Sequence, residues 1–270
     1  FQDNGRNNFY HIGIPFSGAM DNRNFLLANT ISNNGINNPV LEFAYQGPKL
    51  KYIGENISIN VTGDVNFKII RKNKNLEFSC YENIVLENND CLDILSTNRS
   101  VYGYLSIGGT FEVDYYLNSC STNTKAKIGA NSGEKLEKGQ IIQLKNIKKI
   151  LPKNKIEYLN SKIENIRIIK GPHFDYFSKD AIDLFFSNEF NVTKLSDRMG
   201  IRLKGPKISN IKNTNIKSEG LVKGVIQITA DGDPIIMLSD HGTIGGYPKI
   251  GVVISADYDK LVQIPPASKI

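Results

Sequence analysis

The chain has 270 residues, a formal net charge of +6, 40% hydrophobic residues and no Trp. This composition is typical of a folded globular protein and excludes a disordered one. No apolar run is long enough to span a bilayer, and no secretory leader is recognisable, so we expect a cytoplasmic protein without a membrane partner. The length allows one large domain or two lobes of about 130 residues each.

The first predicted element is a helix that Asp21 caps and that Asn33-Asn34-Gly35 ends. Apolar residues then alternate at 57–61 and 101–107, as in half-buried strands. Turn sequences are predicted at Thr62-Gly63-Asp64, Asn88-Asn89-Asp90, Gly108-Gly109 and Asp231-Gly232-Asp233. This pattern predicts a mainly β protein with few helices, and it favours barrels or sandwiches.

A polar stretch at Asn146–Glu164 marks the expected boundary, with one lobe at 1–155 and a second at 156–270. Basic residues are dense at Lys145–Lys155, which predicts a solvated linker. A nucleic-acid patch is the weaker alternative because no aromatic residues are interleaved for base stacking. A second helix is predicted to begin at Ser178. Its expected buried stripe consists of Ile182, Phe185 and Phe186.

Cys80, Cys91 and Cys120 are odd in number and lack C-x-x-C spacing, which argues against a disulfide framework or a thiolate zinc site. No two histidines have metal-ligand spacing, so we predict no metal. No G-x-x-x-x-G-K-[ST] loop occurs, so ATP would not be held by a standard phosphate loop of this chain. No Met-Lys pair occurs either, so biotin is not expected to be attached here.

Two glycine-containing segments carry the first candidate residues. Residues 3–6 and 13–21 place glycines beside polar side chains, so a ligand can approach the backbone. The substrate-binding candidates there are Arg6, Ser17 and Asp21, although helix capping alone explains Asp21. In Gly171-Pro172-His173, His173 is a further candidate contact, and tying down a turn is the favoured alternative.

Two later segments complete the set. In Ser196–Leu203, the planar guanidinium of Arg198 suits a carboxylate, phosphate or carboxybiotin oxygen, or it forms a structural ion pair with Asp197. Segment 227–249 gathers a carboxylate, a phenol and an ammonium around glycines, as binding of a small amide requires, although Gly245-Gly246 can be only a turn. Its candidates are Gln227 for substrate binding and Asp240, Tyr247 and Lys249 for catalysis.

Six motifs follow one another along the chain. They are D-x-G-R at 3–6, S-G-A-M-D at 17–21, G-P-H at 171–173, S-D-R-M-G-x-R-L at 196–203, S-E-G at 218–220 and T-x-G-G-Y-P at 243–248. In this order they resemble the signature of the biotin-dependent carboxyltransferase subdomain A and B family, which includes allophanate hydrolase subunit 2. The resemblance covers essentially the whole chain. It implies two linked cyclophilin-like β-barrel lobes and a partner, a subunit 1 protein of related fold.

The resemblance implies three possible functions. The first is a subunit of an ATP-dependent 5-oxoprolinase, a hetero-oligomer in which a third, lactam-opening subunit also acts and ATP is used to open 5-oxoproline to glutamate. The second is transfer of a carboxylate from carboxybiotin to urea or a related amide. The third is a regulatory binding protein that antagonises a kinase inhibitor.

For the first function we expect anion contacts from Arg6 and Arg198, and amide N–H binding or base catalysis by Asp240. Tyr247 and Lys249 would stabilise a developing oxyanion. One departure from the family concerns residues 118–122, Asn-Ser-Cys-Ser-Thr, where the family usually has G-S-R-S-T. Cys120 therefore removes one potential anion contact.

Overall fold

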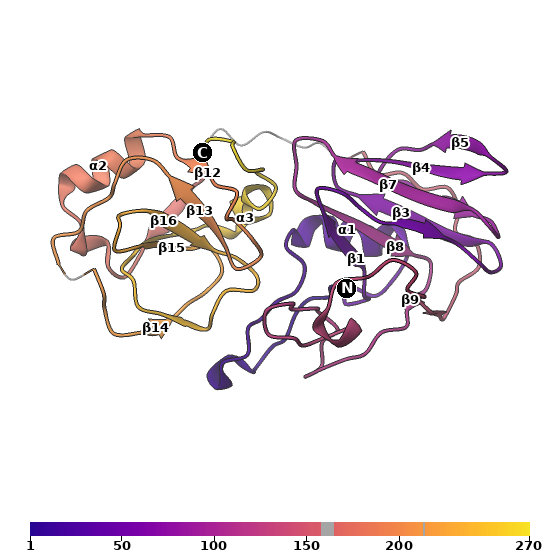
Figure 1. The fold of residues 1–270 in the computed structure, drawn as a ribbon, viewed down its shortest axis with the longest axis horizontal. Coiled ribbons are helices and arrows are strands. Elements are labelled where there is room, and N and C mark those ends of the chain that lie inside the picture. The colour runs from indigo at the N-terminus through magenta and orange to yellow at the C-terminus, as the bar shows by residue number, and fades with distance from the viewer. Residues whose placement is uncertain (158–164, 213) are drawn as a thin grey trace. The chain divides into compact units, whose positions relative to one another are not determined.

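A computed structural model describes residues 1–157, 165–212 and 214–270, and strands dominate it (Figure 1). The chain packs as two compact units: the first contains residues 1–5 and 21–160, and the second contains 6–20 and 161–270. The sequence-based division places all of 1–155 in one lobe, whereas the structure groups residues 6–20 with the second unit. Part of the expected boundary stretch, 158–164, lies outside the described residues.

The first unit is built from antiparallel sheets. Its elements are α1 (Asn22–Ile31), the 3-10 helix η2 (Asn131–Gly133), β1 (Leu41–Ala44), β2 (Lys49–Lys51), β3 (Ile57–Thr62), β4 (Val65–Arg71), β5 (Lys74–Glu77), β6 (Ile84–Leu86), β7 (Cys91–Thr97), β8 (Tyr102–Ile107), β9 (Thr110–Phe111) and β10 (Leu144–Lys145). The strand orders are β1-β8-β3-β6, β2-β7-β4-β5 and β10-β9. The predicted turns join β3 to β4, β6 to β7 and β8 to β9, which confirms them.

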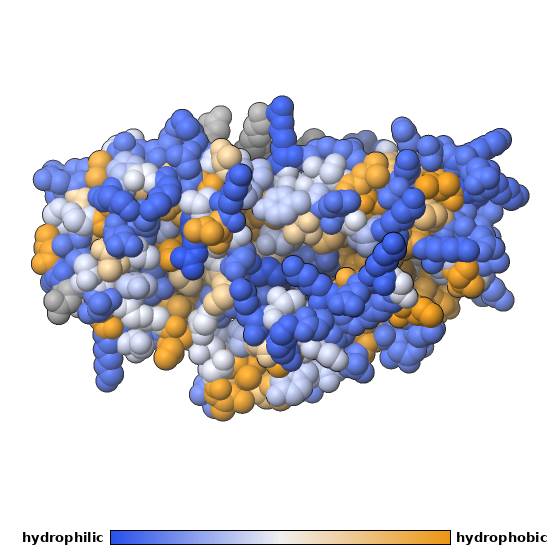
Figure 2. Space-filling model, in the orientation of Figure 1, coloured by the Kyte–Doolittle hydropathy of each residue, from blue (hydrophilic) through white to orange (hydrophobic). Residues whose placement is uncertain are grey.

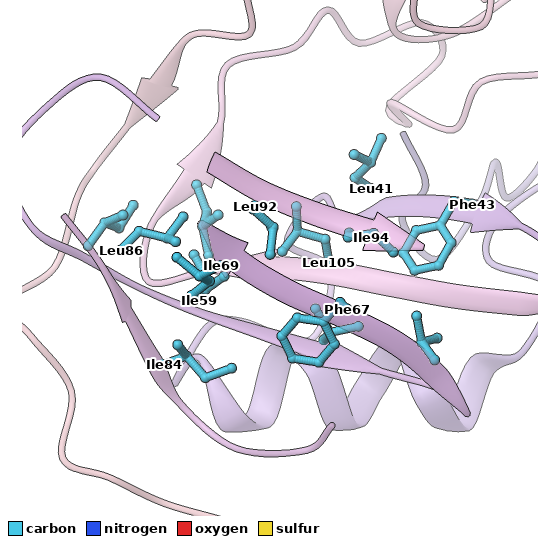
Figure 3. Close-up of a cluster of buried hydrophobic side chains, with 14 of the residues drawn as sticks. Leu41, Phe43, Ile59, Phe67, Ile69, Ile84, Leu86, Leu92, Ile94 and Leu105 are labelled. Carbon is cyan, nitrogen blue, oxygen red and sulfur yellow. The ribbon is translucent and has the colours of Figure 1, made fainter. Parts of the chain in front are cut away.

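The hydrophobic core of this unit receives side chains from both larger sheets. Figure 3 shows them directed toward one another from neighbouring strands. Members include Leu41, Phe43, Ile59, Phe67, Ile69, Ile84, Leu86, Leu92, Ile94 and Leu105. Burial of each such side chain contributes about 1.5–3 kcal/mol relative to exposure, so this cluster is the main source of stability of the unit.

The prediction of half-buried strands is wrong for β3 and β8, because every residue of both strands is buried. Helix α1 packs on them. The alternate side chains of β3 are polar, and two of them bond to the helix: Asn60 Nδ2 donates to the Ala28 carbonyl at 3.0 Å, and Thr62 Oγ1 donates to the Asn24 carbonyl at 2.8 Å. The alternation in the sequence shows that this face of β3 is polar, but it does not show that helix α1 covers it.

The basic stretch after β10 is largely exposed, as predicted for a solvated stretch, but it is also bonded to the rest of the first unit. The Nζ of Lys148 donates to the Asn33 carbonyl at 2.5 Å and to Asn34 Oδ1 at 2.6 Å, close to the end of α1. A cation there stabilises the negative end of the helix dipole. Further along, the Leu151 N–H donates to Ser58 Oγ at 2.9 Å.

The second unit has one larger sheet and several short helices among its described residues. Its elements are η1 (Tyr10–Ile12), β11 (Ile168–Lys170), η3 (Phe174–Tyr176), α2 (Lys179–Ser187), β12 (Asn191–Val192), β13 (Gly200–Lys204), β14 (Glu219–Gly220), β15 (Val225–Ile228), β16 (Pro234–Met237), β17 (Ile244–Gly245), β18 (Lys249–Val253) and α3 (Ser255–Leu261). The strand orders are β11-β18-β15-β16-β13-β12 and β14-β17. The predicted turn at 231–233 joins β15 to β16.

Helix α2 begins where the sequence predicts, since Ser178 Oγ accepts from the Ala181 N–H at 3.2 Å. Its predicted buried stripe is wrong: Phe186 is 57% exposed, and only Ala181 of the helix is buried. Phe185 instead packs near Phe190, with ring centroids 5.6 Å apart. The helix lies on the surface of the second unit, and only a narrow strip around Ala181 is buried.

The mainly β prediction is confirmed by this arrangement. Figure 2 shows that the visible face is largely hydrophilic, with hydrophobic residues in separate patches. Within the described residues, no helix has the length and apolar character needed to cross a bilayer.

Candidate active site

The candidate residues fall into the second unit, with the exception of Asp21. Asp21 is the N-cap of α1: its carboxylate accepts from the Asn24 N–H at 2.9 Å and from Asn24 Nδ2 at 2.6 Å. Its own N–H donates to the Tyr104 hydroxyl at 2.7 Å. The capping alternative therefore accounts for Asp21 within the first unit.

Arg198 and Asp240 form a two-bonded ion pair. Nε of Arg198 donates to Oδ2 of Asp240 at 2.8 Å, and Nη2 donates to Oδ1 at 3.1 Å. Nη2 also donates to the Gly18 carbonyl at 2.7 Å. Asp197, the partner that sequence suggests for Arg198, instead accepts from the N–H groups of Met199 and Gly200 through Oδ1. The arginine thus fixes the turn before β13 to segment 6–20.

Segment 6–20 is held to the second unit along its length. The Arg6 N–H donates to the Phe16 carbonyl at 2.7 Å, and the Ser17 N–H donates to the Ser239 carbonyl at 2.9 Å. Lys223 Nζ donates to the Ser17 carbonyl at 3.2 Å and lies 4.5 Å from the centroid of the Phe16 ring. Arg6 and Ser17 are both buried. These contacts show how the two candidate residues are positioned.

Tyr10 and His241 connect the same segment to the loop after Asp240. The Tyr10 hydroxyl lies 2.8 Å from Nε2 of His241, and Nδ1 of this ring lies 2.6 Å from the Gly242 carbonyl. A carbonyl only accepts, so Nδ1 carries the proton and Nε2 accepts from Tyr10. Burial lowers the pKa of His241 and raises the pKa of Tyr10 to about 12. Both groups are therefore neutral at physiological pH.

A second group of residues surrounds Lys249, and we call it the Lys249 cluster: the candidates His173, Gln227 and Lys249, together with Glu219. Lys249 Nζ lies 3.0 Å from Glu219 Oε2, and His173 Nε2 lies 3.6 Å from Glu219 Oε1. The Lys249 N–H donates to Nδ1 of His173 at 3.3 Å, which leaves the ring proton on Nε2 of the neutral ring. An ammonium and an imidazole N–H thus face one carboxylate.

Gln227 belongs to this cluster through its place in the sheet, and Gly245 lies next to its amide. Gln227 lies opposite Lys249 in the β15–β18 ladder, and its Nε2 donates to the Tyr247 carbonyl at 3.1 Å. A Cβ on Gly245 would lie 2.8 Å from Gln227 Nε2, closer than real Cβ atoms approach. Gly245 is therefore required for the amide of Gln227 to lie where it does. Tyr247, the expected catalytic phenol, is partly exposed.

The electrostatics of the Lys249 cluster depend on Glu219. The hydrogen bond from Lys249 lowers the pKa of Glu219, and the charge of Lys249 contributes in the same direction. Lys249 has a side chain only 3% exposed, whereas that of Glu219 is 48% exposed. A buried ammonium needs an anionic partner, and Glu219 supplies it for Lys249. Glu219 is not among the site residues predicted from sequence, although it is the central residue of the S-E-G motif.

Asp3 of the D-x-G-R motif lies in the first unit and has a structural role there. Its Oδ1 accepts from the hydroxyls of Ser119 at 2.6 Å and Ser121 at 2.7 Å, and its Oδ2 accepts from the Cys120 N–H at 2.8 Å. Cys120, at the position where an arginine is expected, is fully buried beside this carboxylate. The motif therefore divides between the two units after Gly5.

Comparison with known proteins identifies the family. Residues 12–270 match the family described as carboxyltransferase domain, subdomain A and B. The chain is 28% identical to a subunit of 5-oxoprolinase from Escherichia coli, over 98% of this chain and 84% of that protein. It is 29% identical to urea amidolyase of Saccharomyces cerevisiae, over 98% of this chain and 15% of that protein.

A solved structure agrees with this match. The urea carboxylase of Kluyveromyces lactis superimposes with a TM-score of 0.89 and 29% identity, over 100% of this chain and 26% of that one. The chain thus spans most of one relative and a small fraction of two larger ones. It belongs to the carboxyltransferase subdomain A and B family, as the six motifs predicted.

Proposed function

We propose that this chain is a subunit of an ATP-dependent amidohydrolase of the 5-oxoprolinase type, which opens 5-oxoproline to glutamate. The observation that carries the proposal is the Lys249 cluster, in which a buried ammonium and an imidazole N–H face one carboxylate and Gln227 lies opposite Lys249 in the strand ladder. A cyclic amide with a carboxylate presents groups that these side chains recognise. The similarity to a 5-oxoprolinase subunit over 84% of that protein supports the same assignment.

The chemistry explains why ATP is needed. Amide resonance makes the lactam carbonyl a poor electrophile, and transfer of the γ-phosphoryl group to the lactam oxygen gives a good one. Water then adds to the ring carbon, and the C–N bond breaks as the nitrogen takes a proton, which leaves an acyl phosphate. A second water hydrolyses this group. The products are glutamate, ADP and phosphate, so the atoms balance with two waters consumed.

The side chains of this subunit would hold the substrate in place for these steps. Lys249 and His173 bind an anionic oxygen, and Gln227 contacts the amide. Tyr247 is proposed as a further donor to the oxyanion. Because Arg198 and Asp240 bind each other, we propose that they position residues 17–19 rather than act on the amide.

The remaining parts of the proposal concern the assembly. ATP would bind in the complex with a subunit 1 homologue and a lactam-opening subunit, in the cytoplasm. The likeness to proteins that are themselves named as subunits of 5-oxoprolinase supports a hetero-oligomer of this kind.

The test is glutamate formation by the chain purified with its encoded neighbours. We expect glutamate from 5-oxoproline with ATP and without biotin. Lys249→Met should reduce turnover per folded complex by at least about 100-fold, since it removes the charge-assisted contact of a buried ammonium. Lys269→Met is the matched control, because that lysine also pairs with a glutamate but is 62% exposed. Equal turnover by both variants would contradict the assignment.

Carboxyl transfer from carboxybiotin to urea or a related amide is the second candidate, and the match to urea carboxylase favours it. It requires a biotin carboxylase and a biotinylated domain among the neighbours. Activity that depends on biotin and bicarbonate, with no glutamate formed from 5-oxoproline, would establish it instead. Tight binding of the partner without any ATP turnover would favour the regulatory alternative.

A further inference from the structure

The two sides of the Lys249–Glu219 pair differ in how firmly they are held. Lys249 begins β18, a strand paired on both sides with β11 and β15. His173 is fixed to the same residue twice: its N–H donates to the Lys249 carbonyl, and its Nδ1 accepts from the Lys249 N–H, both at 3.3 Å. The Tyr176 ring packs edge-on against the imidazole at 4.8 Å. The two donors are therefore preorganised.

Glu219 lies on a much weaker element. Strand β14 consists of Glu219 and Gly220, and in the described part of the chain it pairs only with β17. Among the described residues, no atom lies within 4 Å of where a Cβ on Gly220 would be, so the backbone there borders open space. A glutamate side chain that is 48% exposed can turn into water by side-chain rotation, without movement of the strand. Water then solvates the Glu219 carboxylate, so separation from Lys249 costs the glutamate little free energy.

The opposite is true of Lys249, which cannot remain buried and charged without an anion. Exchange of the Glu219 carboxylate for another carboxylate keeps the number of charges and of charge-assisted hydrogen bonds unchanged. A phosphate could also bind an ammonium, but Nζ and Nε2 each face a different oxygen of the same carboxylate, which matches a ligand with two oxygens.

We propose that Lys249 and His173 form the subsite for the carboxylate of the substrate, and that Glu219 occupies this subsite until the substrate displaces it. The identity of the ligand as a carboxylate-bearing cyclic amide rests on the proposed function; the displacement by a carboxylate does not. Glu219 is then an internal competitor for the subsite: a ligand with a carboxylate must displace it, whereas a neutral amide leaves it in place.

The test compares 5-oxoproline with 2-pyrrolidinone, the same lactam without the carboxylate, by calorimetric titration of the full chain. Glu219→Gln and Glu219→Ala should each bind 5-oxoproline about tenfold more tightly than wild type, the factor expected if Glu219 fills the subsite in about nine molecules of ten. Binding of 2-pyrrolidinone should not change. Adding Lys249→Met to either variant should abolish the gain. Glu189→Gln, which removes the same charge from an exposed pair, is the control.

A measurement on the wild-type chain keeps the proposal open to refutation even if the variants fold poorly. Saturation with 5-oxoproline should raise the pKa of Glu219 toward its ordinary value, because the carboxylate loses the Lys249 hydrogen bond that lowers it. The carbon resonance of this carboxyl group reports the change. Weaker binding by the Glu219 variants, or a Glu219 pKa that stays low in the complex, would overturn the proposal.

The outcomes separate this subsite from the enzymatic assignment. If the assembled complex forms no glutamate but Glu219 variants still gain affinity for carboxylates, the subsite stands and the proposed function falls. If glutamate is formed but Glu219 variants lose affinity, Glu219 holds the substrate directly and the displacement is refuted.

Discussion

Replacing Asp240 by Asn tests whether the Arg198–Asp240 pair is structural or catalytic. The substitution keeps the side-chain shape but removes the charge that accepts bonds of 2.8 and 3.1 Å from Arg198. Breaking a buried pair by removing one partner costs about 3–5 kcal/mol. The Arg198 side chain is 22% exposed and keeps its bond to the Gly18 carbonyl. We therefore expect the free energy of unfolding of the second unit to fall by about 2–3 kcal/mol.

A double-mutant cycle with Arg198→Met isolates this interaction. The free energy of unfolding is measured in urea, with hydrogen exchange as the probe of the second unit. The two substitutions should show a coupling free energy of about 1.5–3 kcal/mol. Turnover per folded molecule of the assembled enzyme should change little in Asp240→Asn. Additive stability effects would refute the reasoning about the pair, and a large loss of turnover without loss of stability would return Asp240 to the catalytic role that its motif suggests.

Three further substitutions test individual contacts. Asp257→Asn should lower the free energy of unfolding by about 1 kcal/mol above about pH 4, a value reduced for the exposure of Arg167. The Arg167 hydrogen bond lowers the pKa of Asp257 from 3.8 to about 2, so the difference from wild type should vanish as the pH falls through that value in acid titration of stability. Asp21→Ala should cost about 1 kcal/mol in the first unit by denaturation, whereas Asp21→Asn, an equally good N-cap, should cost little. Gly245→Ala should lower turnover by about tenfold or more while the chain stays folded by circular dichroism, because its Cβ would lie 2.8 Å from Gln227 Nε2.

Local features of the fold were predictable from sequence. The start of α1 follows from a capping carboxylate, and the strand ends follow from turn residues, because both depend on neighbours within a few positions. The burial of both faces of β3 was not predictable. Asn60 reads as a solvent-facing residue, and only the approach of the Ala28 carbonyl makes its burial favourable.

The candidate site shows the same limit. Motif order leads to His173, Gln227 and Lys249, because glycines and polar residues at fixed spacing are visible in the sequence. The partnership of Lys249 with Glu219 joins residues 30 positions apart, and no local pattern encodes it. For the same reason sequence pairs Arg198 with its neighbour Asp197 rather than with Asp240, which lies 42 residues away.

The division of residues 6–20 from their flanking segments has a consequence for biosynthesis. This segment leaves the ribosome well before its partners, since its contacts with Arg198, Lys223 and His241 span 180, 206 and 231 residues. The second unit can therefore be completed only after residues up to His241 have been synthesised, and it cannot be excised by a single cut. A fragment of residues 161–270 should remain open to protease, and addition of a peptide spanning residues 6–20 should protect it.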